Sequence, residues 1–451
     1  MTRGILLAGT HSGVGKTTVS IGLLGFLGKS FRVVPFKVGP DYIDPGYHQM
    51  VCGRRGYNLD LFLLGPEKVQ DCFQRRAGEG EIAVVEGVMG LFDGWGEDNL
   101  GSSAQVAKIL SLPIILVVDA RGMTGSVAAL VQGFRDFDAD VEIRGVFLNR
   151  VRNDHHLRIL RCSIERDTGL PVVGFLPDDP ELLLPERHLG LVPAQEAMVS
   201  EKIERILAAF ARNVDGERLL QMMNEIRTRP SPECLVEKTV RVGYACDEAF
   251  HFYYQSSLES LEEGGMELVP FSPLRNGNLP EGISGLYLGG GFPEVFAPQL
   301  SANWCLQKAI WRAVARGMPV YAECGGLMYL SQGLKGEGGI FPMVGVFPFQ
   351  VEMTSRLQRF GYARAVVLED NLLASRGTVL RGHEFHYSRI VGGEGRATYR
   401  VEKPQGQESW RCGFMEKNAL ATYLHIDFIA FPHAVRRFAR TCQEFALKEV
   451  H

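Results

Sequence analysis

Short apolar runs recur along the chain and are separated by segments of helical length. In the first half they cover residues 5–8, 33–37, 82–86, 114–119, 146–149 and 172–175. Continuous runs of Val, Ile and Leu indicate strands that are buried on both faces, as in a parallel sheet with helices on either side. We therefore expect a three-layer α/β/α fold in this half, beginning with the strand at 5–8.

The pattern of apolar positions becomes helical near residue 196 and is strand-like again from residue 240. Residues 196–238 begin with a charged helical pattern and continue into a Pro-containing connector. The apolar positions of this helical pattern share one face: Ile203, Ile206, Leu207 and Phe210. New apolar runs follow at 240–245, 268–271, 285–288 and 319–322. We predict two three-layer α/β/α domains, 1–195 and 239–451, joined by a helical segment and linker at 196–238.

Composition narrows the class of protein. The chain has 451 residues, 45% hydrophobic and 22% charged, which fits a globular protein of two or three domains. No run approaches the roughly 20 apolar residues that cross a bilayer, so we expect no membrane partner. The net charge of −4 provides no basic stripe and argues against nucleic acid. Nine cysteines without any Cys-x-x-Cys pair favour a reduced, cytoplasmic setting over a zinc site or disulfide framework.

A glycine-rich turn links the first predicted strand to a helical pattern. Residues 9–18 read Gly-Thr-His-Ser-Gly-Val-Gly-Lys-Thr-Thr, with five residues between Gly9 and Gly15 where a phosphate-binding loop usually has four. Backbone N–H groups of such a turn converge on phosphate oxygens. The side chain of Lys16 can then reach the outer phosphates, and the Thr17 hydroxyl can bind Mg²⁺. The predicted nucleotide-binding residues of this turn are Gly13, Gly15, Lys16, Thr17 and Thr18.

Polar residues follow several of the predicted strands. They are Asp41, Asp44, Glu86, Asp93, Asp119 and Asn149. Ligands of parallel α/β sheets gather at the carboxyl ends of the strands, which makes these side chains candidates for a site. Turn and helix-cap roles are the alternative, above all for Asp44, which precedes a proline, and for Asn149.

The second half carries a nucleophile pattern. Cys324 follows the predicted strand 319–322 within the sequence Glu-Cys-Gly-Gly, and a strand-to-helix elbow exposes a nucleophile. The glycine run 289–291 ends another predicted strand and can offer N–H groups to an oxyanion. His425 could act as the base, because such partners meet in space rather than in sequence. A buried structural cysteine and a core histidine are the alternatives.

These residues resemble a class I glutamine amidotransferase, a flavodoxin-like fold that releases ammonia from glutamine through a cysteinyl thioester. The resemblance implies Cys324 and His425 as the catalytic pair. It implies an oxyanion hole formed by Gly290, Gly291 and Gly325. The family usually has His-x-Glu, whereas this chain has His425-Ile426-Asp427, so the role of Asp427 stays open. Lack of that glutamate is typical of the amidotransferases of corrinoid biosynthesis.

The loop spacing resembles that of dethiobiotin synthetase-like ATPases, and the two halves together resemble the cobyrinate a,c-diamide synthase family. Further motifs that carry this resemblance cover residues 36–45, 85–94, 185–191, 249–254 and 381–388. The family activates a carboxylate with the γ-phosphoryl group of ATP, and ammonia then displaces phosphate. We therefore expect ATP- and glutamine-dependent amidation of the a and c carboxylates of cobyrinate.

The resemblance also implies roles for individual residues in the first half. Thr17, Asp41 and Glu86 would hold Mg²⁺, which prefers oxygen ligands. Lys16 and Lys37 would offset charge on the transferred phosphoryl group. Two further roles are implied at strand ends. Asp93 would orient the substrate carboxylate or assist deprotonation of ammonia, and Asn149 would contact the adenine edge.

A macrocycle with many carboxylates calls for local cationic and polar contacts. The predicted substrate residues are Asp44, Arg359, His383, His386 and Tyr387. Expected partners are this macrocycle and glutamine, with a homodimer among the expected assemblies. We also expect ammonia to follow a protected route to the activated carboxylate.

Several alternatives stay open. The same chemistry could act on hydrogenobyrinate or nickel sirohydrochlorin. A MinD-like ATPase switch with a docking C-terminal domain and a cobyric acid synthase are further possibilities.

Overall fold

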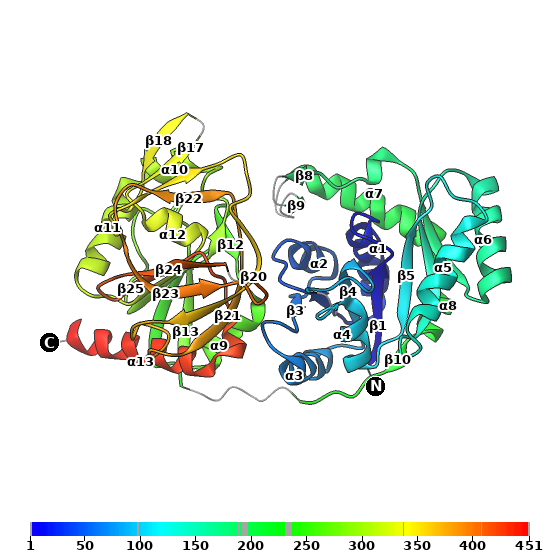
Figure 1. The fold of residues 1–451 in the computed structure, drawn as a ribbon, viewed down its shortest axis with the longest axis horizontal. Coiled ribbons are helices and arrows are strands. Elements are labelled where there is room, and N and C mark those ends of the chain that lie inside the picture. The colour runs from blue at the N-terminus through cyan, green and yellow to red at the C-terminus, as the bar shows by residue number, and fades with distance from the viewer. Residues whose placement is uncertain are drawn as a thin grey trace. The chain divides into compact units, whose positions relative to one another are not determined.

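The structure, a computed structural model, describes residues 2–96, 99–187, 190–191, 197–230, 237–336, 338–406 and 408–449. The chain divides into two units, Met1–Pro232 and Glu233–His451. Each unit has its own central sheet (Figure 1). Each also has its own apolar core. His188 and Leu189, in the predicted motif 185–191, lie outside the described residues.

The first unit is built on a parallel sheet. Its parallel strands are β1 (Arg3–Gly9), β2 (Val33–Val38), β3 (Tyr57–Leu59), β4 (Ile82–Gly90), β5 (Ile114–Asp119), β6 (Ile143–Val151) and β7 (Val172–Pro177). They lie in the order β3-β2-β4-β1-β5-β6-β7, and the short β10 (Asn224–Glu225) pairs antiparallel with β1. Because β4 lies between β1 and β2, the carboxyl ends of these three strands are neighbours at one edge of the sheet.

Helices follow the strands of this unit. They are α1 (Lys16–Gly28), α2 (Asp44–Cys52), α3 (Pro66–Ala77), α4 (Ser103–Leu110), α5 (Ser126–Phe137), α6 (Asp154–Thr168), α7 (Ala197–Asn213) and α8 (Gly216–Gln221). Most lie between consecutive parallel strands, as right-handed crossovers require. The described part of the segment 196–238 therefore supplies two of the helices of the first unit.

Helix α7 packs directly against α1. A Cβ on Gly22 of α1 would lie 2.4 Å from Cδ2 of Phe210, and a Cβ on Gly25 would lie 2.2 Å from Cδ2 of Leu207. The ring of Phe210 also stacks on that of Phe147 in β6 at a centroid distance of 5.2 Å. The apolar face predicted for this helix is thus buried in the core of the first unit.

The second unit has a mixed sheet. Its strands lie in the order β13 (Met266–Phe271), β11 (Val240–Ala245), β14 (Gly285–Leu288), β16 (Val320–Glu323), β25 (Ala419–Thr422), β24 (Ser409–Glu416), β23 (Arg396–Glu402), β20 (Arg359–Val367) and β21 (Val379–His386). The first five strands are parallel and the last four continue the sheet antiparallel. The apolar runs predicted four of the five parallel strands and missed β25 and the antiparallel extension.

Smaller elements complete the second unit. Strand β12 (Phe250–Phe252) pairs antiparallel with β15 (Gly290–Gly291), and the sheet β18-β17-β19-β22 lies apart from the main sheet. These four strands are β17 (Gly333–Gly336), β18 (Gly339–Pro342), β19 (Gln350–Met353) and β22 (Ser388–Val391). The helices are α9 (Gln255–Glu263), α10 (Ala297–Ala302), α11 (Trp304–Ala315), α12 (Gly325–Leu330) and α13 (Pro432–Glu449).

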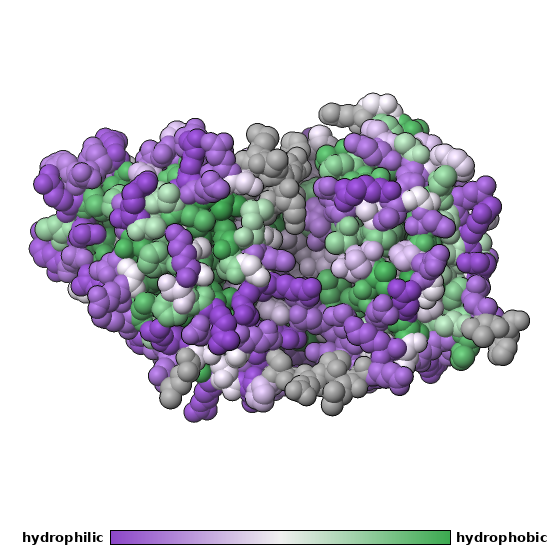
Figure 2. Space-filling view, turned by 180° about the vertical axis from the view of Figure 1, so that it is seen from behind, coloured by the Kyte–Doolittle hydropathy of each residue, from purple (hydrophilic) through white to green (hydrophobic). Residues whose placement is uncertain are grey.

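The predicted α/β class is confirmed for both units. Hydrophilic residues are spread over the face shown in Figure 2, with apolar residues between them. Among the described residues, none of the helices has both the length and the apolar character needed to cross a bilayer.

Candidate active sites

The glycine-rich turn joins β1 to α1 as predicted. Gly15 caps α1 with a φ of 92°, a left-handed conformation that favours glycine. A Cβ on Gly15 would also lie 2.1 Å from Nδ2 of Asn149. That amide group donates a hydrogen bond to the Val14 carbonyl at 2.9 Å. The buried Asn149 side chain therefore supports the turn, and the predicted adenine contact has no test in the structure.

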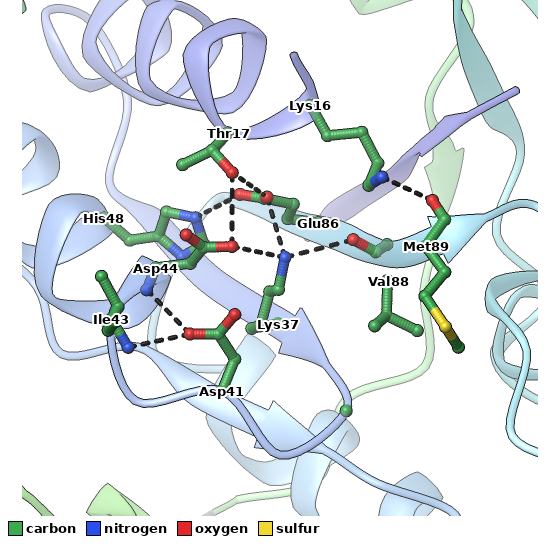
Figure 3. Close-up of polar contacts among 12 residues, drawn as sticks. Lys16, Thr17, Lys37, Asp41, Ile43, Asp44, His48, Glu86, Val88 and Met89 are labelled. Atoms are coloured by element: carbon green, nitrogen blue, oxygen red, sulfur yellow. Dashed lines mark hydrogen bonds and ion pairs between the residues drawn. The ribbon is translucent and has the colours of Figure 1, made fainter. Parts of the chain in front are cut away.

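A cluster of opposite charges lies beside this turn (Figure 3). Nζ of Lys37 on β2 lies 2.6 Å from Oδ2 of Asp44 and 2.9 Å from Oε1 of Glu86 on β4. The Thr17 hydroxyl lies 3.0 Å from Oε1 of Glu86 and 3.3 Å from Oδ2 of Asp44. Nε2 of His48 on α2 lies 2.7 Å from Oε2 of Glu86. Four elements thus bring one hydroxyl, two carboxylates and an ammonium together.

Burial makes these charges depend on one another. Burial by itself lowers the pKa of Lys37, but the charges of Asp44 and Glu86 outweigh it and raise that pKa. Burial and the charge of Asp41 raise the pKa of Asp44 well above its usual range. Burial would raise the pKa of Glu86, yet Lys37 and a hydrogen bond from His48 hold it well below its usual range. Each ion is stabilised only while its partners remain in position.

Lys16 lies close to this cluster and is buried. Its ammonium donates hydrogen bonds to the Met89 carbonyl and, at 3.5 Å, to the His11 carbonyl. Burial and the charge of Lys37 lower the pKa of Lys16 to about 8. An anionic ligand beside Lys16 would favour its charged form.

The donor set of this cluster fits a small, hard cation. Oxygens of Asp44 and Glu86 face the ammonium of Lys37, and the Thr17 hydroxyl lies within hydrogen-bond distance of both carboxylates. Oxygen ligands of this kind suit Mg²⁺. Oδ1 of Asp41 instead accepts hydrogen bonds from the Ile43 and Asp44 amides, at 2.8 and 3.0 Å. Within the described ranges, no group of three or more His, Cys, Asp or Glu side chains is arranged to hold a metal ion. Mg²⁺ would therefore need further oxygens, such as those of a phosphate.

The remaining predicted residues of the first unit lie on the same edge. Asp93 follows β4, is exposed, and accepts a hydrogen bond from the Gly90 amide at 2.8 Å. Its charge raises the pKa of Lys16, against the stronger effects of burial and of Lys37. Gly13, with a φ of 79°, and Thr18 belong to the turn and to the first residues of α1.

The predicted elbow at Cys324 is present in the second unit. Cys324 lies between β16 and α12, with a φ of 45° and a ψ of −96°. Its amide donates to the Thr422 carbonyl at 2.7 Å. A Cβ on Gly325 would lie 3.1 Å from the Gly291 amide nitrogen. The elbow thus lies against the glycine run 289–291, as an oxyanion hole requires.

His425 meets the elbow from the segment after β25. The Cys324 side chain lies close enough to raise the pKa of His425. A Cβ on Gly290 would lie 2.7 Å from Cε1 of His425, which explains glycine at this position. The ring of His425 stacks on that of His383 at a centroid distance of 5.1 Å, and the Tyr254 hydroxyl lies 2.7 Å from Nε2 of His383. The structure therefore brings the predicted pair Cys324 and His425 together.

Two side chains to which the motifs assign no role contact these sites. His48 contacts Glu86 as described above, and Oε2 of Glu323 lies 3.4 Å from Nδ1 of His425. Burial alone lowers the pKa of His425, but the neighbouring Cys324 and Glu323 side chains raise it to about 10. The sequence could have indicated Glu323, because it is a charged residue at the end of an otherwise apolar strand and next to the nucleophile.

The residues predicted to meet the macrocycle differ in exposure. His383 and His386 are buried, at 5% and 7% exposure, and the ring of His386 stacks on Tyr423 at 3.9 Å. Tyr387 is half-buried. Arg359 is partly exposed, pairs with Glu408 at 2.9 Å and lies over the Trp410 ring. Two of the four thus lie beside the thiol site and two on or near the surface. Asp44 belongs to the charge cluster.

Comparisons with known proteins bear on both sites. Residues 5–192 match the family described as the CobQ/CobB/MinD/ParA nucleotide binding domain. Residues 241–432 match the CobB/CobQ-like glutamine amidotransferase domain. The predicted nucleotide-binding and amidotransferase halves are thereby confirmed.

Relatives match over nearly the whole chain. The cobyrinate a,c-diamide synthase of Caldanaerobacter subterraneus subsp. tengcongensis is 49% identical, and the match covers 99% of this chain and 100% of the relative. The enzyme of that name from Methanothermobacter thermautotrophicus is 40% identical, with 98% and 100% covered. The one from Salmonella typhimurium is 41% identical, with 96% of each chain covered.

Proposed function

The chain belongs to the cobyrinate a,c-diamide synthase family and is a glutamine-dependent amide-forming ligase, and from this premise we propose that it amidates the a and c side-chain carboxylates of cobyrinate. Each amidation would consume one ATP and one glutamine. A carboxylate is a poor acceptor for ammonia, because direct attack would have to expel oxide. Phosphorylation of the carboxylate provides phosphate as the leaving group.

The first unit would carry out the phosphoryl transfer. The turn at Gly13 and Gly15 would bind the ATP phosphates through backbone N–H groups, and Thr18 would support it from the start of α1. Lys16 and Lys37 would neutralise charge on the transferred group, which is the main contribution a protein makes to this chemistry. Asp93, exposed beside Lys16, would orient the substrate carboxylate or accept a proton from ammonia.

Mg²⁺ fits the same cluster. Thr17 and Glu86 would hold it together with Asp44, whose carboxylate oxygen lies 3.3 Å from the Thr17 hydroxyl, and Asp41 would add negative charge nearby. When bound, the ion supplies charge neutralisation for the phosphates. Lys37, which contacts Asp44 and Glu86, would add a second positive charge beside the ion. His48 would keep Glu86 in position.

The second unit would supply the ammonia. His425 would take the thiol proton of Cys324, which leaves a thiolate beside an imidazolium, and the sulfur would then attack the glutamine amide carbon. The amide N–H groups at Gly290, Gly291 and Gly325 would stabilise the oxyanion, and the proton would return to the departing ammonia. Water then releases glutamate from the thioester. The observation that supports this proposal is the proximity of His425 to Cys324, which lies on a strand-to-helix elbow.

A two-substrate assay with matched variants tests the proposal. Cobyrinate, ATP and Mg²⁺ are supplied with either glutamine or ammonium chloride, and diamide is followed by mass spectrometry. Cys324→Ala should lower the glutamine-dependent rate at least about 1,000-fold and leave the ammonia-dependent rate within about twofold of wild type. Lys16→Ala should abolish diamide formation with both nitrogen donors. Equal loss of both rates in Cys324→Ala would contradict the division of labour. Turnover of hydrogenobyrinate or nickel sirohydrochlorin in place of cobyrinate would contradict the substrate.

A further inference from the structure

Asp427 occupies the position of the glutamate in the usual His-x-Glu sequence, but its hydrogen bonds go elsewhere. Oδ2 accepts a hydrogen bond from the Ser256 hydroxyl at 2.7 Å. Oδ1 accepts from the Ser257 hydroxyl at 3.0 Å and from the Ile429 amide at 3.1 Å. Both carboxylate oxygens are thus used to fix the start of α9 and the turn after Asp427. This arrangement leaves the orientation of His425 to another group.

Glu323 is the carboxylate that lies beside His425. It is 1% exposed and ends β16, directly before the nucleophile. Oε1 accepts hydrogen bonds from the Tyr321 hydroxyl at 2.7 Å and from the Ile426 amide at 3.2 Å. Oε2 accepts from the Tyr287 hydroxyl at 3.1 Å and lies 3.4 Å from Nδ1 of His425. Three donors therefore hold the carboxylate in one orientation, with one oxygen facing the imidazole.

The electrostatics of this group favour a partnership with His425. A buried carboxylate needs a cation or several donors to stay ionised. Among the ion pairs of the described residues, His425 is the cationic partner found within 4 Å of Glu323. Burial raises the pKa of both Tyr287 and Tyr321 well above the usual range, so these phenols stay protonated and keep donating.

We propose that Glu323 is the positioning residue of His425 and replaces the carboxylate of the usual His-x-Glu sequence. Glu323 accepts a hydrogen bond from the Nδ1–H group of His425, which fixes the tautomer and leaves Nε2 to take the thiol proton of Cys324. The imidazolium formed in that step is stabilised by the Glu323 charge. No bond to Glu323 is made or broken. This inference rests on the proposed roles of Cys324 and His425.

Glu323→Gln tests the proposal in the two-substrate assay, because glutamine keeps the size of the side chain and removes its charge. The variant should lower the glutamine-dependent kcat at least about 100-fold with the KM for glutamine within about threefold of wild type. Its ammonia-dependent rate should stay within about twofold, which shows that the first unit works. Glu323→Asp should recover part of the glutamine-dependent kcat, because it restores the charge.

Asp427→Asn is the matched control, since it neutralises the other nearby carboxylate. We expect its glutamine-dependent kcat to stay within about threefold of wild type. The inference is overturned if Asp427→Asn loses glutamine turnover while Glu323→Gln keeps it. A higher KM for glutamine with an unchanged kcat in Glu323→Gln also overturns it. So does a glutamine-dependent kcat of Glu323→Asp that is no higher than that of Glu323→Gln. If Cys324→Ala itself retained glutamine turnover, the proposed function would fail instead, so the two failures are distinguishable.

Discussion

The two sites share a backbone device and differ in their charges. Each lies where a parallel strand turns into a helix through a residue with positive φ, 92° at Gly15 and 45° at Cys324. In the first unit, the ammonium of Lys37 is buried between two carboxylates. In the second unit, one carboxylate is held by three neutral hydrogen-bond donors and faces one imidazole.

This difference indicates two ways to prepare a buried site. The cluster around Lys37 is balanced by its own ions, so a charged ligand must exchange with contacts that already exist. The thiol site has its carboxylate fixed by the phenols of Tyr287 and Tyr321 before any ligand arrives. We therefore expect the first site to respond to ligands and ions, and the second to respond to the loss of single hydrogen bonds.

Lys37→Met should give the largest effect, because it leaves Asp44 and Glu86 buried without their cation. We expect the free energy of unfolding of the first unit to fall by about 3–5 kcal/mol in the absence of divalent ions. Addition of MgCl₂ should recover part of it, because Mg²⁺ can replace the lost charge. Urea unfolding with and without MgCl₂ measures this, with the exposed Lys29→Met as control. Equal stability of Lys37→Met and Lys29→Met would show that the Lys37 ammonium does not stabilise the buried carboxylates.

The stability of the second unit should depend on pH through His425. The pKa of His425 is about 10 in the folded protein, above its ordinary value of 6.5. Its contribution to stability is therefore complete below about pH 6.5 and is lost as the pH rises through about 10. The stability difference between wild type and His425→Gln, measured by urea unfolding from pH 6 to 10, should shrink as the pH rises. A difference that grows over this range would show that His425 is not held as an imidazolium.

Asn149→Ala should have a moderate effect on the first unit. The substitution removes the hydrogen bond to the Val14 carbonyl, so the free energy of unfolding should fall by about 1–2 kcal/mol. The KM for ATP should rise, because the phosphate-binding turn loses its support. Differential scanning fluorimetry and ATP titration of the ammonia-dependent reaction measure the two effects. A higher KM with unchanged stability would favour the predicted adenine contact instead.

Tyr287→Phe should have the smallest effect. It removes one of three donors to Glu323 and leaves the other two in place. We expect the free energy of unfolding to fall by about 1 kcal/mol. The glutamine-dependent kcat should fall several-fold, with the ammonia-dependent rate unchanged. A loss of turnover as large as that of Glu323→Gln would mean that the carboxylate depends on a single phenol for its orientation.

Most parallel strands were readable from the sequence, β3 and β25 excepted, and the antiparallel strands were not. The apolar runs at 240–245 and 285–288 coincide with β11 and β14, because strands buried on both faces are apolar throughout. Strands β20 and β23 alternate buried with exposed residues and contain several arginines, so they have no continuous apolar run. Their pairing depends on contacts between distant segments, which the local pattern does not encode.

Motif spacing predicted the turn and the elbow, but it could not predict which neighbours the side chains near them would contact. Asp41 and Asp44 lie three residues apart in one turn, and the turn geometry decides that Asp44 faces Lys37 while an oxygen of Asp41 accepts amide hydrogen bonds. Asp427 matches the position of the usual carboxylate in sequence, yet Ser256 and Ser257 bind it. Such choices depend on neighbours from other elements.

The backbone at Cys324 carries a cost that the turn at Gly15 avoids. A residue with a Cβ at a φ of 45° and a ψ of −96° is strained by about 1–3 kcal/mol, and glycine at the same position would relieve much of it. Cys324→Gly would thus yield a chain that folds more stably and has no nucleophile. Stability of the fold and the presence of the nucleophile therefore conflict at this one residue. Selection for thermal tolerance alone would enrich variants that cannot hydrolyse glutamine.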